Sequence, residues 1–306
     1  GETEQNVLKV WQGHTDTPLN KNGLRQAKLL ALRLKDSNAT VYSSNLKRAS
    51  ETASFLSKKI ELRETLREIN VGDFTGMPVG QTFSSNNEIF QSLQNDSYQF
   101  PNGETVKEFK QRVKDELEYI FGNIENGSEA IVVTHGFFIG TAIGLSIGFN
   151  NYPFPIGNIE NTSISTLIKR DSITQVNKFN DSLHLSELNI DFPRETTKNK
   201  ITFIRHGQTD SNTSGIWQGH IDNPLNETGK HTAQKLRNTF DEYDVYLSST
   251  YKRALETLSL VTDNKDILTS YNFIEMNLGN WEGLKTSEIL EPYHDNFINA
   301  LFLDFK

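Results

Sequence analysis

The chain has 306 residues, a formal net charge of −8 and no cysteine. This length is enough for two domains of ordinary size, and an acidic chain without an arginine-rich arm is not expected to bind nucleic acid. The absence of cysteine excludes disulfides and thiolate metal sites and is typical of a cytoplasmic protein. No apolar run reaches the roughly 20 residues that a membrane span needs, so no membrane partner is expected.

Helical and strand-like patterns alternate along the first two thirds of the chain. Helices are predicted where apolar residues recur at helical spacing, and strands where short apolar runs occur. In chain order these are a helix at Leu24–Leu34, a strand at Thr40–Ser43, a helix at Leu46–Lys58, a helix at Thr105–Phe121, a strand at Ala130–Thr134, a helix to about Ser146, and closing strands at Thr162–Ile168 and Ile173–Phe179. This alternation predicts an α/β fold of three layers, in which helices cover both faces of a mostly parallel sheet.

The last third of the chain repeats the first in order. Gly1–Asn6 matches Gly207–Asn212, and further matches join Trp11–His14 to Trp217–His220, Ser43–Ala49 to Ser248–Ala254, and Glu68–Gly72 to Glu275–Gly279. Matches that keep their order along the chain predict a tandem duplication. We expect repeat 1 at residues 1–182, a polar linker at 183–199 and repeat 2 at 200–306.

Two of the predicted strands end in a histidine followed by glycine. The apolar run Ile201–Ile204 leads into Arg205, His206 and Gly207, and Ala130–Thr134 leads into His135 and Gly136. Open α/β sheets bind ligands at the carboxyl ends of their strands. The repeats add an arginine to each half, Arg48 and Arg253, and a glutamate before a glycine-containing turn, Glu68 and Glu275.

These residue types suit the transfer of a phosphoryl group. An arginine fork binds phosphate oxygens through two hydrogen bonds. A neutral histidine can attack phosphorus, and a protonated carboxyl can give its proton to the leaving oxygen. A second histidine, in its charged form, can stabilise the equatorial oxygens of the group in transfer. Each motif alone also fits a surface ion pair, but their order along both halves favours function.

The remaining histidines do not directly follow a predicted strand. His184, His231 and His294 are interpreted as solvated side chains, whereas His14 and His220 follow Gln-Gly loops and are candidates for the rim of the pocket.

The motifs resemble those of the histidine phosphatase superfamily, the phosphoglycerate mutase-like enzymes. The resemblance implies that His206 is the phosphate-accepting nucleophile, Arg205 and Arg253 clamp the phosphate, and Glu275 donates the proton. In repeat 1 it implies a clamp at Arg48, a donor at Glu68 and a second pocket histidine at His135. The implied substrate-binding positions are Gly207, Thr209, Asn212, Gln218, Gly219, Asn6, Gln12, Gly13 and Gly136. The family needs neither metal nor cofactor.

The resemblance implies a phosphatase rather than a mutase. A repeat of this length leaves little room for the insertions that close the mutase pocket, and Phe100–Thr105 resembles the small-phosphatase branch, which includes the α-ribazole phosphatases. We therefore expect a phosphomonoesterase that acts on small phosphorylated metabolites through a phosphohistidine. Phosphoglycerate mutase-type transfer is the alternative, and assembly with further copies of the chain stays open.

Neither repeat is expected to hold a full set of these residues. Repeat 1 lacks the strand with Arg-His, and repeat 2 lacks its C-terminal part. Three interpretations follow: a fragment of a longer tandem enzyme, a strand at 200–206 that docks into repeat 1, or a phosphate-binding pseudo-enzyme without catalysis.

Overall fold

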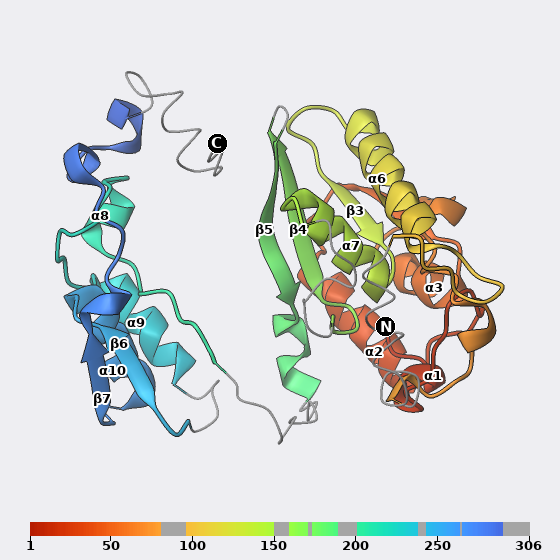
Figure 1. The fold of residues 1–306 in the computed structure, drawn as a ribbon, viewed down its shortest axis with the longest axis horizontal. Helices are drawn as coiled ribbons and strands as arrows, with labels where there is room; N and C mark the ends of the chain where they lie inside the picture. The colour runs from red at the N-terminus through yellow and green to blue at the C-terminus, as the bar shows by residue number, and fades with distance from the viewer. Residues whose placement is uncertain are drawn as a thin grey trace. The chain divides into compact units, whose positions relative to one another are not determined.

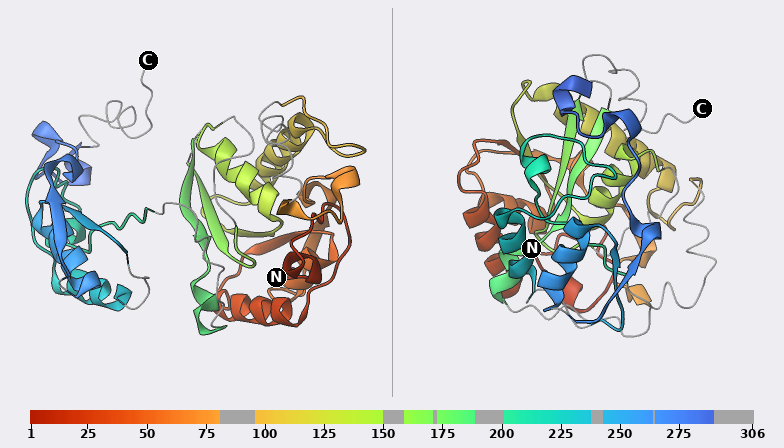
Figure 2. Two further views of the ribbon diagram at one scale, coloured as in Figure 1. Left: turned by 60° about the horizontal axis from the view of Figure 1, so that its bottom comes forward. Right: turned by 90° about the vertical axis from the view of Figure 1, so that its left-hand side faces the viewer.

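A computed structural model describes residues 1–80, 96–149, 159–170, 173–188, 201–237, 243–263 and 265–289. It divides the chain into two compact units, residues 1–194 and 195–306, drawn in Figures 1 and 2. Among the helices of the described ranges, none combines the length and the apolar character that crossing a bilayer requires.

The centre of unit 1 is a parallel sheet of three strands. β1 (Thr40–Ser44) lies between β2 (Ile60–Arg63) and β3 (Ala130–Val133), with Val41 opposite Ile60 on one side and Ile131 on the other. β4 (Ile164–Arg170) and β5 (Ile173–Asp181) form a separate antiparallel hairpin. The strands predicted at 40–43, 130–134, 162–168 and 173–179 are therefore present, whereas β2 was not predicted.

Helices pack against both faces of this sheet. The helices of unit 1 are α1 (Glu4–Val7), α2 (Lys21–Arg33), α3 (Lys47–Ser54), α6 (Val106–Asn123) and α7 (Gly136–Ser146), and its short 3-10 helices are η1 (Glu64–Leu66), η2 (Gly72–Phe74) and η3 (Leu183–Leu188). Tyr42 of β1 joins a buried apolar cluster with Phe109 of α6 and Phe138 of α7. Side chains alternate along a strand, so the buried Val41 points to the other face, where α3 packs on β1 and α2 packs on α3. The expected α/β fold is confirmed.

The long helix α6 begins where its sequence provides a cap. The Thr105 hydroxyl accepts a hydrogen bond from the Glu108 N–H (3.1 Å), and the Glu108 carboxylate accepts one from the Thr105 N–H (2.9 Å). This reciprocal pair satisfies N–H groups that the first turn of a helix leaves without partners. The helix therefore starts one residue after Thr105.

Residues 183–188, which the sequence assigns to the linker, form η3 and belong to unit 1. Leu185 is buried, and η3 packs against α2. His184, expected to be solvated, is half-buried: its ring lies 3.1 Å from the Thr162 hydroxyl and 3.3 Å from the Arg33 guanidinium. Its position beside Arg33, far away in the sequence, could not be read from local pattern.

Unit 2 repeats the succession of elements that opens unit 1. α8 (Asp210–Thr213), α9 (Glu227–Leu236), β6 (Tyr246–Ser249), α10 (Lys252–Thr262), β7 (Ile267–Ser270), η4 (Tyr271–Phe273) and η5 (Gly279–Trp281) follow one another in this order. β6 and β7 are parallel and paired in register, as β1 and β2 are in unit 1.

The predicted strand at Ile201–Ile204 is wrong. The segment has no regular secondary structure, and the side chains of Ile201 and Phe203 are 77% and 85% exposed. A strand exists only through hydrogen bonds to a neighbouring strand, and within the described part of unit 2 the only paired strands are β6 and β7. An apolar run alone therefore does not make a strand, because a neighbouring strand must also be available to pair with it.

A glycine at the start of the second helix of each unit permits a close backbone approach. A Cβ atom added to Gly23 would lie 2.1 Å from the Glu2 carbonyl oxygen, and one added to Gly229 would lie 2.2 Å from the Gln208 carbonyl oxygen. No other residue fits these positions without a backbone shift. Helices α2 and α9 are thereby packed directly against the segments that carry Thr3 and Thr209.

Candidate active site

In unit 1 the chemistry-bearing residues gather at the carboxyl ends of the three parallel strands. β1 leads into Ser44 and Arg48, β2 leads through η1 to Glu68, and β3 leads to His135. Parallel strands end at one edge of their sheet, which is where such sheets bind ligands.

A buried arginine occupies the same place in each unit. Arg48 is 8% exposed and donates to the carbonyl oxygens of Thr15 (2.7 Å) and Gly13 (2.9 Å). Arg253 is 3% exposed and donates to those of Ile221 (2.7 Å) and Gly219 (2.8 Å).

Neither guanidinium takes part in an ion pair among the described residues, although both are buried. Buried charges are costly unless they are paired. Each of these sites therefore attracts an anion.

His135 follows β3 and is buried beside Ser44. Its Nε2 lies 2.9 Å from the Ser44 hydroxyl. Burial holds the pKa of His135 well below its usual 6.5, and the nearby Arg48 charge acts in the same direction. The ring is therefore neutral at neutral pH. The expectation that the second histidine is charged is wrong for His135, because burial disfavours the charged form.

The carboxyl group of Glu68 is held by two backbone N–H groups. Oε1 accepts from Ile69 (3.0 Å) and Oε2 from Phe137 at the start of α7 (3.1 Å). Removal from water raises the pKa of Glu68, while these hydrogen bonds and the Arg48 charge oppose the rise. A carboxyl with a raised pKa retains a proton that it can donate.

In unit 2, His206 is placed by its own main chain. Its Nδ1 lies 2.7 Å from the Gly207 carbonyl oxygen, and the Gly207 N–H donates to the Thr257 hydroxyl (2.9 Å). Burial lowers the pKa of His206, and the charges of Arg253 and Arg205 lower it further, whereas Glu275 raises it. The structure thus groups His206 with Arg253 and Glu275 of its own unit. Arg205 and Glu275 are exposed.

In each unit a buried threonine forms the hydrogen bonds that hold its loop in place: Thr3 follows Gly1 and Glu2, and Thr209 follows Gly207 and Gln208. Thr209 is fully buried; its N–H donates to the Asn212 amide oxygen (3.0 Å) and its hydroxyl to the Gln218 amide oxygen (3.0 Å). In unit 1, Thr3, Asn6 and Gln12 make the same bonds at 3.0 and 3.1 Å. Asn212, Gln218, Asn6 and Gln12 therefore hold the loop, while Gly13 and Gly219 hold the arginines through their carbonyl groups, and Gly136 begins α7.

Sequence reasoning missed several residues of this site. Thr257 and its counterpart Thr52 receive the N–H groups of Gly207 and Gly1 at the same distance of 2.9 Å. The Glu-Thr pair recurs in both halves, at 51–52 and 256–257, so the repeat itself carried the signal.

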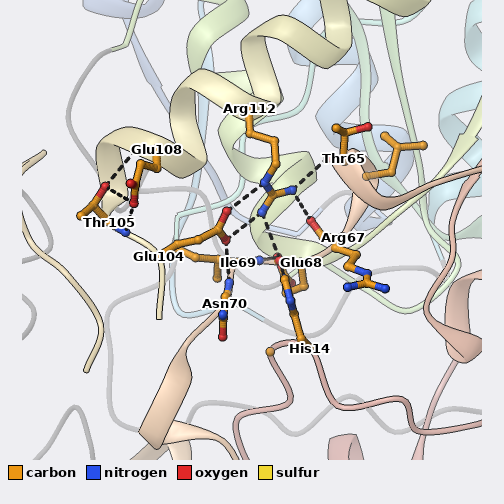
Figure 3. A network of polar contacts seen from close by, with 12 residues as sticks. His14, Thr65, Arg67, Glu68, Ile69, Asn70, Glu104, Thr105, Glu108 and Arg112 are labelled. Atoms are coloured by element: carbon orange, nitrogen blue, oxygen red, sulfur yellow. Dashed lines mark hydrogen bonds and ion pairs between the residues drawn. The ribbon is translucent and has the colours of Figure 1, made fainter. Parts of the chain in front are cut away.

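A second network missed by sequence reasoning lies behind Glu68 (Figure 3). Arg112 of α6 binds the Glu104 carboxylate at 2.9 and 2.8 Å and donates to the carbonyl oxygens of Thr65 (2.9 Å), Arg67 (2.8 Å) and Glu68 (3.3 Å). No local pattern links α6 to this segment. His14 also points to the Glu68 carbonyl (Figure 3).

Of the histidines expected to be solvated, His231 is exposed on α9, and His294 lies outside the described residues. Within the described ranges, no group of three or more histidine, aspartate and glutamate side chains is arranged to hold a metal ion.

The chain is similar to known phosphatases and mutases over most of their length. It is 32% identical to a metal-independent phosphoserine phosphatase of Arabidopsis thaliana over 198 residues, covering 61% of this chain and 81% of that protein. It is 30% identical to a probable phosphoglycerate mutase of Photorhabdus laumondii over 173 residues, covering 54% and 80%.

Solved structures of phosphatases are similar to this chain as well. A phosphoserine phosphatase mutant of Entamoeba histolytica in complex with phosphoserine is 29% identical, with a TM-score of 0.53 over 60% of this chain and 95% of that one. A mycobacterial glucosyl-3-phosphoglycerate phosphatase, 22% identical with a TM-score of 0.54 over 59% and 95%, shares the fold. The family model of the histidine phosphatase superfamily, branch 1, matches residues 1–182 and 201–304. The expected enzyme class is thus confirmed, and the chain belongs to the histidine phosphatase superfamily.

Proposed function

We propose that the chain hydrolyses small phosphomonoesters through a phosphohistidine at His206. The observation that carries the proposal is the buried Arg253 guanidinium, which has carbonyl partners but no carboxylate among the described residues. A phosphate group supplies the missing negative charge, and a planar arginine fork matches two of its oxygens. Arg205, which directly precedes the nucleophile, is proposed as a second clamp.

The hydrogen bond at His206 selects the nitrogen that reacts. A carbonyl oxygen only accepts, so Nδ1 carries the hydrogen that points to Gly207. Because burial lowers the pKa of His206, the ring is neutral and Nε2 holds a free electron pair. We therefore assign Nε2 as the atom that attacks phosphorus.

The reaction then has two steps. A bond forms between His206 Nε2 and phosphorus while the ester oxygen leaves with its electron pair and takes a proton from Glu275. Water then attacks the phosphohistidine, gives its proton back to Glu275 and releases phosphate. In the second step the bond between phosphorus and Nε2 breaks, and its electron pair returns to the His206 ring.

We propose the same roles in unit 1 for Arg48 as clamp, Glu68 as proton donor and His135 as the second pocket histidine. The raised pKa of Glu68 and the link from His135 to Ser44 support this assignment. We further propose that the two units arose by duplication. The two matched segments, 1–182 and 201–304, and the equal hydrogen bonds of both loops support it.

Phosphoserine is the substrate to try first, because the chain is similar to two phosphoserine phosphatases. A phosphoglycerate mutase activity is the second candidate, favoured by the likeness to a probable phosphoglycerate mutase. The two differ in whether water or a second hydroxyl group receives the phosphoryl group. Conversion of 3-phosphoglycerate without release of phosphate would favour the mutase.

The test is phosphate release from phosphoserine and from an aryl phosphate, with chelator present. His206→Ala should abolish turnover, whereas His231→Ala, which changes an exposed histidine on α9, should leave it unchanged. Acid-labile, base-stable labelling of the wild type that is lost in His206→Ala would identify the intermediate. Saturable phosphate binding without turnover in the wild type would make the chain a binding protein instead.

A further inference from the structure

In both units a histidine holds the main-chain carbonyl of the proposed proton donor. His14 Nε2 lies 2.8 Å from the Glu68 carbonyl oxygen, and His220 Nε2 lies 3.1 Å from that of Glu275. A carbonyl oxygen only accepts, so Nε2 carries the hydrogen in each case. The bond recurs although Glu68 is half-buried and Glu275 is exposed.

The same loop also holds the phosphate-binding arginine. The carbonyl groups on either side of His220, those of Gly219 and Ile221, accept the two hydrogen bonds of Arg253 at 2.8 and 2.7 Å. In unit 1 the residues that flank His14 bind Arg48 in the same way. The loop around His220 therefore contacts Arg253 through its backbone, and it contacts the segment of Glu275 through the His220 side chain.

The His220 side chain and main chain are fixed by their surroundings. The His220 N–H donates to Glu282 Oε1 (2.8 Å), which also accepts the Leu278 N–H (3.1 Å) on the far side of Glu275. The ring meets Tyr251 edge to face, with centroids 5.9 Å apart. Tyr251 immediately precedes α10, which carries Arg253.

From this geometry we infer that His220 is a positioning residue, which sets the Glu275 carboxyl relative to the phosphate bound at Arg253; His14 does the same for Glu68. The inference rests on the proposed function. His220 itself transfers no proton and forms no bond to phosphorus. It acts through the main chain of Glu275, whose own carboxylate accepts the Met276 N–H (2.9 Å).

The consequence depends on the leaving group. A basic alkoxide, as in phosphoserine, departs only with a proton, whereas 2,4-dinitrophenolate is stable without one. A misplaced donor therefore slows formation of the phosphohistidine from the first substrate and spares its formation from the second. This first step alone decides kcat/KM, whereas hydrolysis of the phosphohistidine is common to both substrates. A general loss of structure slows both substrates alike.

The experiment compares His220→Ala, His220→Gln and Glu275→Gln with the wild type on phosphoserine and on 2,4-dinitrophenyl phosphate. His220→Ala should lower kcat/KM on phosphoserine by about ten-fold and on the aryl ester by less than about two-fold. Glu275→Gln should show the same selectivity to a greater extent. His220→Gln, whose amide nitrogen can reach the position of Nε2, should recover most of the lost rate.

Equal losses on both substrates in His220→Ala would overturn the inference, as would a His220→Gln protein no better than His220→Ala. A wild type that hydrolyses neither ester contradicts the proposed function itself, so the two failures are distinct. His231→Ala controls for the removal of a histidine outside the site, because His231 is exposed on α9.

Discussion

The Arg112 guanidinium and the Glu104 carboxylate form a two-pronged ion pair, with Nε 2.9 Å from Oε1 and Nη2 2.8 Å from Oε2. The same guanidinium donates to three carbonyl groups between Thr65 and Glu68, and Glu104 accepts the Asn70 N–H (2.7 Å) (Figure 3). Helix α6 is thereby attached to the segment that carries Glu68.

Arg112→Ala should destabilise unit 1 by about 2 kcal/mol, because it leaves a carboxylate and several carbonyl groups without their donor. Arg112→Lys should recover little of this, since an ammonium group cannot reproduce the planar fork. Urea unfolding of the full chain measures both. A midpoint in Arg112→Ala equal to that of the wild type would contradict the prediction; Arg237→Ala, which removes an exposed ion pair with Asp263, is the control.

Arg253→Lys should weaken the binding of inorganic phosphate by about ten-fold or more, because one buried fork that bonds two loop carbonyls is replaced by a point charge. Inhibition of phosphoserine hydrolysis by phosphate measures the effect. Arg48→Lys reports separately on unit 1. If Arg253→Lys binds phosphate as tightly as the wild type, the anion does not bind at Arg253.

The pH dependence of kcat/KM should show that the pKa of His206, the proposed nucleophile, is lowered. Burial and the Arg253 and Arg205 charges lower the pKa of His206 below 6.5, so the fraction of reactive neutral imidazole rises with pH and the neutral form is the major one at pH 7. Arg205→Gln removes a positive charge, so it should raise the pKa of His206 and shift the acid limb of kcat/KM to higher pH. NMR titration of the His206 ring checks this directly, and an unchanged titration would count against it.

Unit 1 should lose stability in mild acid. Burial depresses the pKa of His135 well below 6.5, so below that pH the unfolded chain binds a proton that the folded one does not. The free energy of unfolding should then fall with decreasing pH, by up to about 1.4 kcal/mol per pH unit for a histidine that stays neutral when folded. His135→Gln should flatten this slope, as measured by hydrogen exchange in β1 between pH 7.5 and 5.5. The other histidines are common to both proteins and cancel in the difference.

The sequence predicted the elements well wherever local pattern decides. β1, β3, α6 and α7 begin and end within a few residues of their predicted bounds, because apolar spacing and the Thr105 cap are local signals. The arginines and His206 were identifiable because their motifs recur or match a known family.

Long-range contacts were beyond local pattern. Nothing near Arg112 in the sequence indicates that it binds the carbonyl of Glu68, and nothing near His184 indicates Arg33. The apolar run at Ile201–Ile204 failed in the opposite way, since its pattern fits a strand but no partner strand is paired with it in the described structure.

The glycines at the starts of α2 and α9 bring the backbone of each helix into direct contact with the backbone of the loop before it. With room for only a hydrogen atom between Gly23 and the Glu2 carbonyl, the helix cannot hinge against the segment of Thr3 and Asn6. The other end of α2 is Arg33, whose guanidinium binds the Asp181 carboxylate and lies beside the His184 ring. Helix α2 therefore connects the loop of Thr3 and Asn6 to β5 and η3, through backbone contact at Gly23 and through the side chain of Arg33.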